Sequence, residues 1–348
     1  MWFPSRRELL MAGVAVPASG ANHSTAAEDV SAFFRGKQLR FLVGIPPGGA
    51  YDLIARTVAD HISRYIPGQP TVVVENMPGA SSLVMMNYLY NVAPRDGTVV
   101  GFPMNSVILE PSLNLISRSG GVATFDLSAM TWLGSVGQDP TVLWVGENSS
   151  IRTFDDLHQI SVSLAATTTA ADSYSIETLC NRLLDTKIQL VSGYEGVAQY
   201  LVAFERGEVD GAATTYAALA AARPDWIVNK RIRFLAQFGS ERSSALPDLP
   251  TGVELAPNDD SRAILQLFGL MFTATYPVVL GPNIPSARAQ QLGSAFDQTM
   301  RDPDFASQIK RLYLAPGGVS ADKITKIVQS VEAARPEIVL GLKSALRF

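Results

Sequence analysis

The chain has 348 residues, of which 47% are hydrophobic and 17% charged, with 28 basic against 32 acidic side chains and a formal net charge of −4. This length predicts about two domains, and the apolar share excludes a disordered or fibrous chain. The acidic balance argues against a nucleic-acid partner, because such binding needs clustered Lys and Arg and no basic run here exceeds two residues.

Residues that carry metal or thiol chemistry are scarce. Cys180 is the only cysteine, which excludes an intramolecular disulfide and a cysteine-based zinc site, and its apolar helical setting favours a buried hydrophobic role. The three histidines, His23, His61 and His158, are not within metal-ligand spacing of one another, and we expect His61 at the surface or at a boundary. We therefore expect no metal site and no cofactor.

Residues 1–27 have the layout of an export signal. Arg6 and Arg7 form a charged start, an apolar stretch follows at residues 9–16, and small residues suited to cleavage come next. The run SRRELL also resembles a twin-arginine signal. Because the apolar stretch is too short to span the roughly 30 Å of membrane hydrocarbon, we expect a removed signal peptide and a periplasmic protein.

The remaining chain predicts strands that alternate with helices. Expected strands lie at 40–45, 71–74, 98–102, 132–136, 142–145, 160–165, 188–191, 209–213 and 232–237. Expected helices lie at 52–65, 82–90, around Cys180, and at 197–206, 286–300, 303–312 and 320–345. This order indicates βαβ units with parallel sheets. Two βα blocks of similar length predict an α/β protein with two lobes and a ligand cleft between them.

Three loops between a strand and a helix suit an anionic ligand. The loop at 46–52 places Gly48 and Gly49 before a helix whose first amides are free, but it lacks the glycine pattern and lysine of nucleotide sites. The loops at 166–174 and 192–196 occupy equivalent positions in the second block. The first two also fit plain structural turns, in which Asp52 complements a helix dipole and the threonines cap a helix.

Several motifs in order resemble one family. The runs VGIPPGGAYDLIARTVADHI, TVVVENMPGASS, NVAPRDGTVVG and GYEGVAQYLVAFERGEVDG are similar to the periplasmic solute receptors of tripartite tricarboxylate transporters, the TctC-like or Bug family. A later SSALPDLPT stretch extends the resemblance to about residues 37–345. The resemblance implies a two-lobed, Venus-flytrap fold, each lobe a βα sandwich. It also implies that the protein captures a small organic acid and delivers it to the permease subunits of a membrane transporter.

The resemblance also implies the division of the chain. Lobe 1 comprises residues 37–137 plus 270–348, and lobe 2 comprises residues 138–269. Hinges are expected near 133–142 and 265–273. We expect a monomer.

In the family, ligand carboxylates are held largely by backbone amides and hydroxyls from loops of both lobes. Carried onto this chain, the implied ligand-binding residues are Gly48, Gly49, Ala50, Tyr51, Asp52, Pro78, Gly79, Ala80, Asn105, Ser106, Thr167, Thr168, Thr169, Asp172, Ser173, Tyr174, Tyr194 and Thr214. The chain departs from the family at 165–171, where Ala and Thr replace a glycine-rich loop and restrict the backbone. It also has Tyr51 where a small hydroxyl residue is common, and this ring either closes over a ligand or packs on the lobe.

Two other functions remain open from the sequence. The same lobes would suit a sensor that presents its closed form to a signalling partner. A carboxylate-processing enzyme is disfavoured, because no G-x-S-x-G elbow is present and a triad could draw only on His61 or His158 after signal removal. We therefore expect no catalytic residues.

Overall fold

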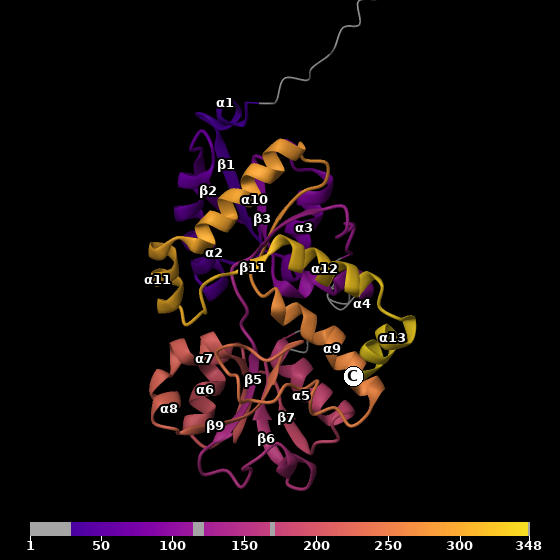
Figure 1. Ribbon diagram of the computed structural model, residues 1–348. Helices are drawn as coiled ribbons and strands as arrows, with labels where there is room; N and C mark the ends of the chain where they lie inside the picture. Colours follow the sequence, from indigo (N-terminus) through magenta and orange to yellow (C-terminus); the bar gives the residue numbers. More distant parts are fainter. Residues whose placement is uncertain (1–28, 114–121, 168–170, 347–348) are drawn as a thin grey trace, which may run out of the picture.

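The computed structural model describes residues 29–113, 122–167 and 171–346. The expected signal segment and the predicted site residues Thr168 and Thr169 lie outside these ranges. Two separate β-sheets organise the described chain, one in each of two lobes (Figure 1). The expectation of a two-lobed α/β fold is confirmed.

The first lobe is built on a six-stranded sheet and the second on a five-stranded sheet. The order in the first sheet is β11 (Val319–Ser320), β4 (Thr131–Ser135), β10 (Pro277–Leu280), β3 (Val99–Phe102), β1 (Gln38–Val43) and β2 (Thr71–Asn76). The order in the second is β7 (Ile188–Val191), β6 (Val162–Ala165), β8 (Gly211–Thr215), β5 (Thr141–Gly146) and β9 (Ile232–Phe238). The first sheet's strands all fall within 37–137 and 270–348; the lobe boundaries themselves stay a prediction.

The chain crosses between the lobes twice, and the two crossing segments are hydrogen-bonded to each other. The Val136 N–H donates to the Tyr276 carbonyl at 3.0 Å, and the Tyr276 N–H donates to Ser135 Oγ at 3.2 Å. The Asp139 N–H donates to Thr275 Oγ1 at 3.1 Å. We call these paired segments, residues 135–140 and 272–277, the lobe junction.

Both sheets are mixed: the parallel pairs expected from the βαβ pattern are present, and each sheet also contains antiparallel strands that the pattern did not predict. β1 pairs in parallel with β2 and β3, and β6 pairs in parallel with β7 and β8. In contrast, β10 is antiparallel to β3 and β4, and β5 is antiparallel to β8 and β9. β5 and β10 each enter their sheet from the lobe junction, at the edge where the parallel strands end, and therefore run in the opposite direction.

Helices cover both faces of each sheet, as the predicted alternation requires. In the first part of the chain they are α1 (Val30–Phe34), α2 (Ala50–Ile62), α3 (Leu83–Asn91) and α4 (Glu110–Leu113). The second lobe contains α5 (Asp172–Leu183), α6 (Val197–Glu205), α7 (Tyr216–Ala222) and α8 (Pro224–Val228). The last helices are α9 (Asp259–Thr273), α10 (Ser286–Arg301), α11 (Pro303–Arg311), α12 (Ala321–Glu332) and α13 (Pro336–Ala345).

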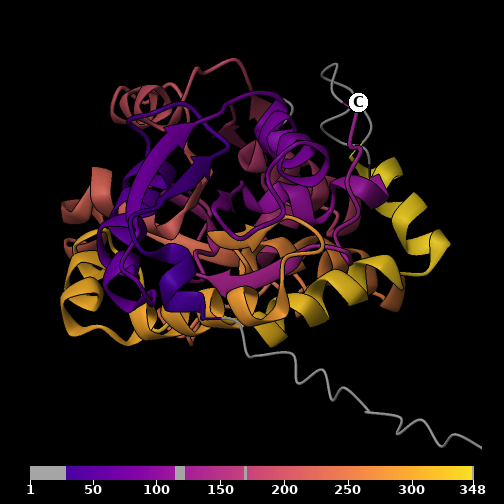
Figure 2. The same ribbon diagram turned by 90° about the horizontal axis from the view of Figure 1, so that it is seen from above.

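The C-terminal helices differ from the prediction in one place. The helix expected over 320–345 is two helices, because Pro336 has no N–H to continue α12 and instead begins α13. Helices α10 to α13 lie together along one side of the molecule (Figure 2). In the described ranges, no helix combines the length and apolarity needed to cross a membrane.

The apolar core is continuous from one lobe to the other. A single cluster of buried side chains includes Leu42 of β1, Leu143 of β5, Phe268 of α9 and Leu342 of α13. α13 packs against α9, α4 and α5, so helices α9 and α13 join the two sheets (Figure 1). The expected lobe boundary at 269/270 consequently falls within the last turn of α9.

The turn after β2 is conformationally strained. Ala80, Ser81 and Ser82 all have positive φ, of 42°, 47° and 77°. Ser82 Oγ donates to the Gly44 carbonyl at 3.1 Å and accepts from the Met104 N–H at 3.0 Å, which ties the ends of β1 and β3 together. A Cβ on Gly44 would lie 2.3 Å from Ser82 Oγ, so this approach requires glycine at 44.

We predict that Ser81→Gly raises the free energy of unfolding by about 0.5–1 kcal/mol. A left-handed non-glycine residue costs about 1–2 kcal/mol, and the added entropy of unfolded glycine offsets part of that gain. Ser307→Gly, in the interior of α11, is the matched control and should lower stability, since its backbone is helical. Urea unfolding of both variants measures the effect, and equal losses in both would contradict the strain.

Candidate functional site

The candidate site lies where the carboxyl edges of the two sheets meet at the lobe junction. Strands β1 and β3 end at this edge in the first lobe, and β6, β7 and β8 end at it in the second. Tyr51 of α2 packs on Tyr276 of the junction with ring centroids 4.6 Å apart. From the second lobe, the Ala217 N–H of α7 donates to Asp139 Oδ1 at 3.0 Å. Open α/β sheets bind ligands at this edge.

Helices α2, α5 and α6 begin at this edge without a side-chain cap. The N-cap residues of α2, α5 and α6 are Gly49, Ala171 and Gly196, and none of them accepts a hydrogen bond from the helix with its side chain. The first amides of a helix need partners, and the helix dipole makes the same position favourable for negative charge. Both lobes thus present amide donors that suit an anion.

The Gly48–Gly49 loop leaves its backbone accessible. Gly48 has a φ of +96°, and a Cβ added at either glycine would meet no atom within 4 Å. Asp52 holds the loop: it accepts from the Gly48 N–H at 3.0 Å, from Arg56 Nε at 3.0 Å and from Asn76 Nδ2 at 2.8 Å. Although burial raises the pKa of Asp52, these bonds lower it to about 2. Asp52 therefore shapes the loop as an ionised residue that is already fully bonded.

Tyr51 packs on the lobe rather than standing free. Its hydroxyl donates to the Thr275 carbonyl and accepts from the Asn105 N–H at 3.3 Å. Asn105 Nδ2 in turn donates to the Met271 carbonyl at 3.2 Å, so α2, the turn after β3 and α9 are linked. Ser106 follows Asn105, and its buried hydroxyl has no hydrogen-bond partner among the described residues. The Ser106 hydroxyl is thus a buried hydrogen-bonding group that no described residue uses, and its role in ligand binding stays a prediction.

The other predicted first-lobe residues lie at the start of α2 and in the turn after β2. Ala50 is the first residue of α2. Pro78, Gly79 and Ala80 form the strained turn after β2, and Gly79 has a φ of 141°. A Cβ on Gly79 would lie 2.6 Å from Val84 Cγ2.

In the second lobe, the predicted residues divide into two groups. Thr167 lies at the carboxyl end of β6, and its N–H donates to Ser173 Oγ at 3.2 Å. Tyr174 follows in the first turn of α5. Tyr194, however, packs on Tyr200, and the 3% exposed Thr214 accepts from Trp144 Nε1 at 3.0 Å. The roles of Tyr194 and Thr214 in ligand binding stay predictions; both side chains have interior partners.

Asp139 is a second carboxylate near the candidate site, and unlike Asp172 it is not among the residues that the sequence predicts. Asp139 is 2% exposed and accepts from the Tyr276 hydroxyl at 3.0 Å as well as from Ala217. Burial raises the pKa of Asp139 to about 6. The only sequence signal for it is a polar GQDP segment between two buried strands, at the expected hinge.

Asp172 is the first residue of α5 and is partly exposed. Burial, and secondly the charge of Asp139, raise its pKa to about 6. Because the folded state holds this proton more tightly than the unfolded chain, ionising Asp172 destabilises the fold as the pH rises from about 4 through 6.

We predict that Asp172→Asn stabilises the protein at pH 7.5 by about 1–2 kcal/mol and has little effect at pH 4. The pKa shift corresponds to about 2–3 kcal/mol, reduced by partial solvent exposure and by about 0.3–1 kcal/mol of lost attraction to the α5 dipole. Chemical unfolding at both pH values measures this difference. A variant that is destabilised at pH 7.5 would contradict the burial of an uncompensated charge.

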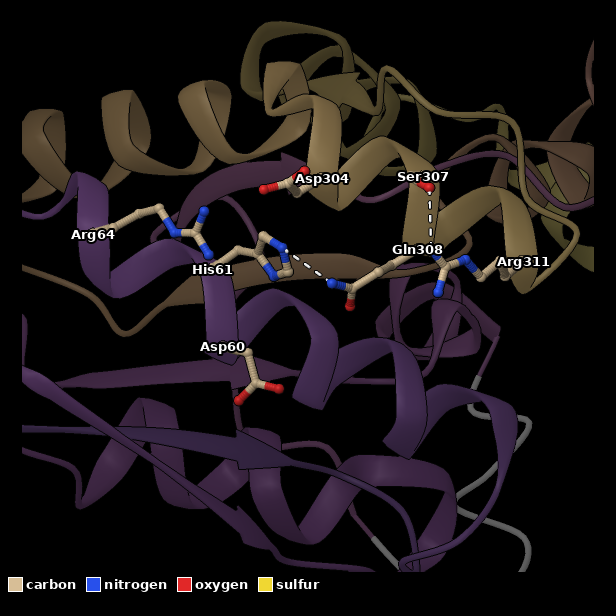
Figure 3. Close-up of a pocket in the computed structure, with 7 residues that line it drawn as sticks. All are labelled: Asp60, His61, Arg64, Asp304, Ser307, Gln308 and Arg311. Atoms are coloured by element: carbon tan, nitrogen blue, oxygen red, sulfur yellow. Dashed lines mark hydrogen bonds between the residues drawn. The ribbon is translucent and has the colours of Figure 1, made fainter.

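A surface pocket between α2 and α11 lies at the other end of α2 (Figure 3). Its lining includes His61, Arg64 and Gln308. His61 is 3% exposed, so the expectation of a surface or boundary position is wrong. Its Nδ1 donates to the Thr57 carbonyl at 2.9 Å, and Nε2 lies 3.4 Å from Gln308 Nε2. α11 covers this turn of α2, which the periodicity of α2 alone does not reveal.

Comparison with solved structures defines the class of fold. A TctC solute-binding protein from Polaromonas superposes with a TM-score of 0.66 at 13% identity, over 89% of this chain and 97% of that one. A Rhodopseudomonas palustris protein with adipate gives 0.62 at 19% identity over 88% and 97%, and MatC from the same species with bound malate gives 0.58 at 16% over 89% and 99%. The chain therefore has the two-lobed fold of periplasmic solute-binding proteins.

The family follows from sequence comparison. The family model "Tripartite tricarboxylate transporter family receptor", TctC, matches residues 54–341. A UPF0065 protein from Cupriavidus necator is 22% identical over 324 residues, covering 90% of this chain and 90% of the relative. The chain belongs to the TctC family of receptors, and the resemblance drawn from its sequence motifs is confirmed.

Proposed function

We propose that this protein is a periplasmic receptor that captures a small organic acid between its two lobes and delivers it to the membrane subunits of a tripartite transporter. The observation that carries the proposal is the meeting of uncapped helix starts from both lobes at the lobe junction. Amides of α2 from one lobe and of α5 and α6 from the other are suited to the two ends of an anion.

The comparisons support the same ligand class. The family is one of receptors, and two structural relatives hold adipate and malate, which are both dicarboxylates. Residues 1–27, read as an export signal, support a periplasmic location. Binding across the junction would stabilise the closed arrangement of the lobes, which is the state that a transporter subunit can distinguish from the empty one.

The first experiment is thermal unfolding of the purified protein with a panel of organic acids, with sugars as controls. A ligand at 100 times its dissociation constant stabilises a protein by about 2.7 kcal/mol, which a melting curve resolves. We expect stabilisation by a group of related carboxylates. A protein that no acid stabilises would contradict the proposal.

We further predict that Gly49→Leu weakens binding of the stabilising acid by about tenfold or more. Gly49 has an extended backbone, with φ of −87° and ψ of 173°, so leucine is tolerated there and fills the open space above the loop. Gly293→Leu is the matched control, because Gly293 lies in α10 and an added Cβ there also meets nothing within 4 Å. Calorimetric titration of both variants decides: unchanged affinity in Gly49→Leu would remove this loop from the site.

A further inference from the structure

Two carboxylates lie at the candidate site, and their negative charges would repel a ligand that carries only negative charge. Asp139 comes from the first crossing segment and Asp172 from the start of α5, and the charge of Asp139 acts on Asp172. Asp139 accepts from the hydroxyl of Tyr276, whose ring packs on Tyr51 of the first lobe. Helix α5, which begins at Asp172, packs against β8, and α7, which follows β8, donates its Ala217 N–H to Asp139. The edge that offers amides to an anion therefore also carries two negative side chains.

Neither carboxylate has a cationic partner within the part of the chain that the structure describes. Asp139 accepts hydrogen bonds from neutral groups, namely the Ala217 amide and the Tyr276 hydroxyl. The Asp172 carboxylate accepts no hydrogen bond from a described residue and takes part in no ion pair there. A carboxylate as buried as Asp139, which is 2% exposed, is normally paired with a cation, as the 4% exposed Asp52 is with Arg56. Asp172 is partly exposed and adds a second negative charge without a cation among the described residues, so the two aspartates together leave a positive charge to be supplied by a ligand.

Thr141 supplies an independent observation at the same place. It is 1% exposed, and its hydroxyl has no hydrogen-bond partner among the described side chains and backbone groups. Thr141 is directly opposite Thr215 in the β5–β8 pairing, so their side chains lie on the same face of the sheet. Leu143 and Ala213, two residues further along the same face, pack with α5, so Thr141 lies on the face of the sheet that α5 covers, and α5 begins at Asp172. The Thr141 hydroxyl is therefore a buried hydrogen-bonding group that the described residues leave unused.

We infer that the natural ligand is an acid that also carries an ammonium group, with its carboxylate on the helix amides and its ammonium group on Asp172, backed by Asp139. The inference rests on the proposed function and names the ligand class within it. An ammonium group has three N–H donors and a positive charge, so it would give the Asp172 carboxylate the cationic hydrogen-bond donor that no described residue provides. A plain dicarboxylate would instead bring a second negative charge toward two uncompensated ones.

The test compares acids that differ only in an ammonium group: aspartate with succinate, glutamate with glutarate, and 4-aminobutyrate with butyrate. Affinities are measured by calorimetric titration at pH 7.5, where both carboxylates are ionised. In the unmodified protein we expect the amino member of at least one pair to bind about tenfold to a hundredfold more tightly. In Asp172→Asn the two acids of each pair should bind with about equal affinity. The plain acid should bind this variant as tightly as it binds the unmodified protein, or more tightly.

Two further variants separate binding from folding. Asp322→Asn removes an exposed first-turn aspartate from α12 and should leave the preference unchanged. Asp172→Glu keeps the charge and should retain part of the preference. Melting curves of all the variants confirm that each one is folded.

The outcomes are distinguishable. Plain acids that bind the unmodified protein as tightly as their amino partners would overturn this inference and leave the proposed function standing. A preference for amino acids that persists in Asp172→Asn would overturn the role of Asp172. Failure of all six acids to bind, when another plain acid of the wider panel does bind, would overturn this inference alone. Failure of every acid in that panel would overturn the proposed function as well.

Discussion

The hydrogen bonds between the two crossing segments position the candidate site. Backbone and side-chain hydrogen bonds join residues 135–139 to 275–276, so the two crossing segments form one lobe junction and are not two independent linkers. From the first lobe, the Tyr51 hydroxyl donates to the Thr275 carbonyl of the lobe junction, and from the second lobe the Ala217 N–H donates to Asp139. The starts of α2 in the first lobe and α7 in the second are therefore both fixed to the lobe junction by these contacts.

Much of the fold could be predicted from the sequence because it depends on local patterns. Short apolar runs ended by Pro and Gly correctly predicted β1, β2 and β3, and the helical spacing of apolar residues correctly predicted α2 and α5. Strand direction was not predictable, since β5 and β10 have the same composition whichever way they run. The split between α12 and α13 was readable in principle, because Pro336 cannot continue a helix.

The candidate site was harder to predict, because its chemistry depends on which side chains already have partners. Family resemblance placed Asp52 and Asp172 in the site on equal terms. The structure pairs Asp52 with Arg56, an i, i+4 spacing that the sequence already contains, whereas Asp172 has an isoleucine at that spacing and no ion pair with a described residue. Asp139 and Thr141 matter only because a distant segment, β8 with α7, comes to lie beside them.

Helix α13 has a mechanical consequence. It packs on α9 and α4 and also on α5, where Arg182 Nη1 donates to the Ser344 carbonyl at 2.8 Å. The lobes are thus joined at a third place, well along the chain from the two crossings. A simple hinge through residues 135–140 and 272–277 would pull α5 away from α13 and expose apolar surface. Any separation of the lobes must therefore either break the contacts of α13 with α5 or keep α13 in place against both lobes.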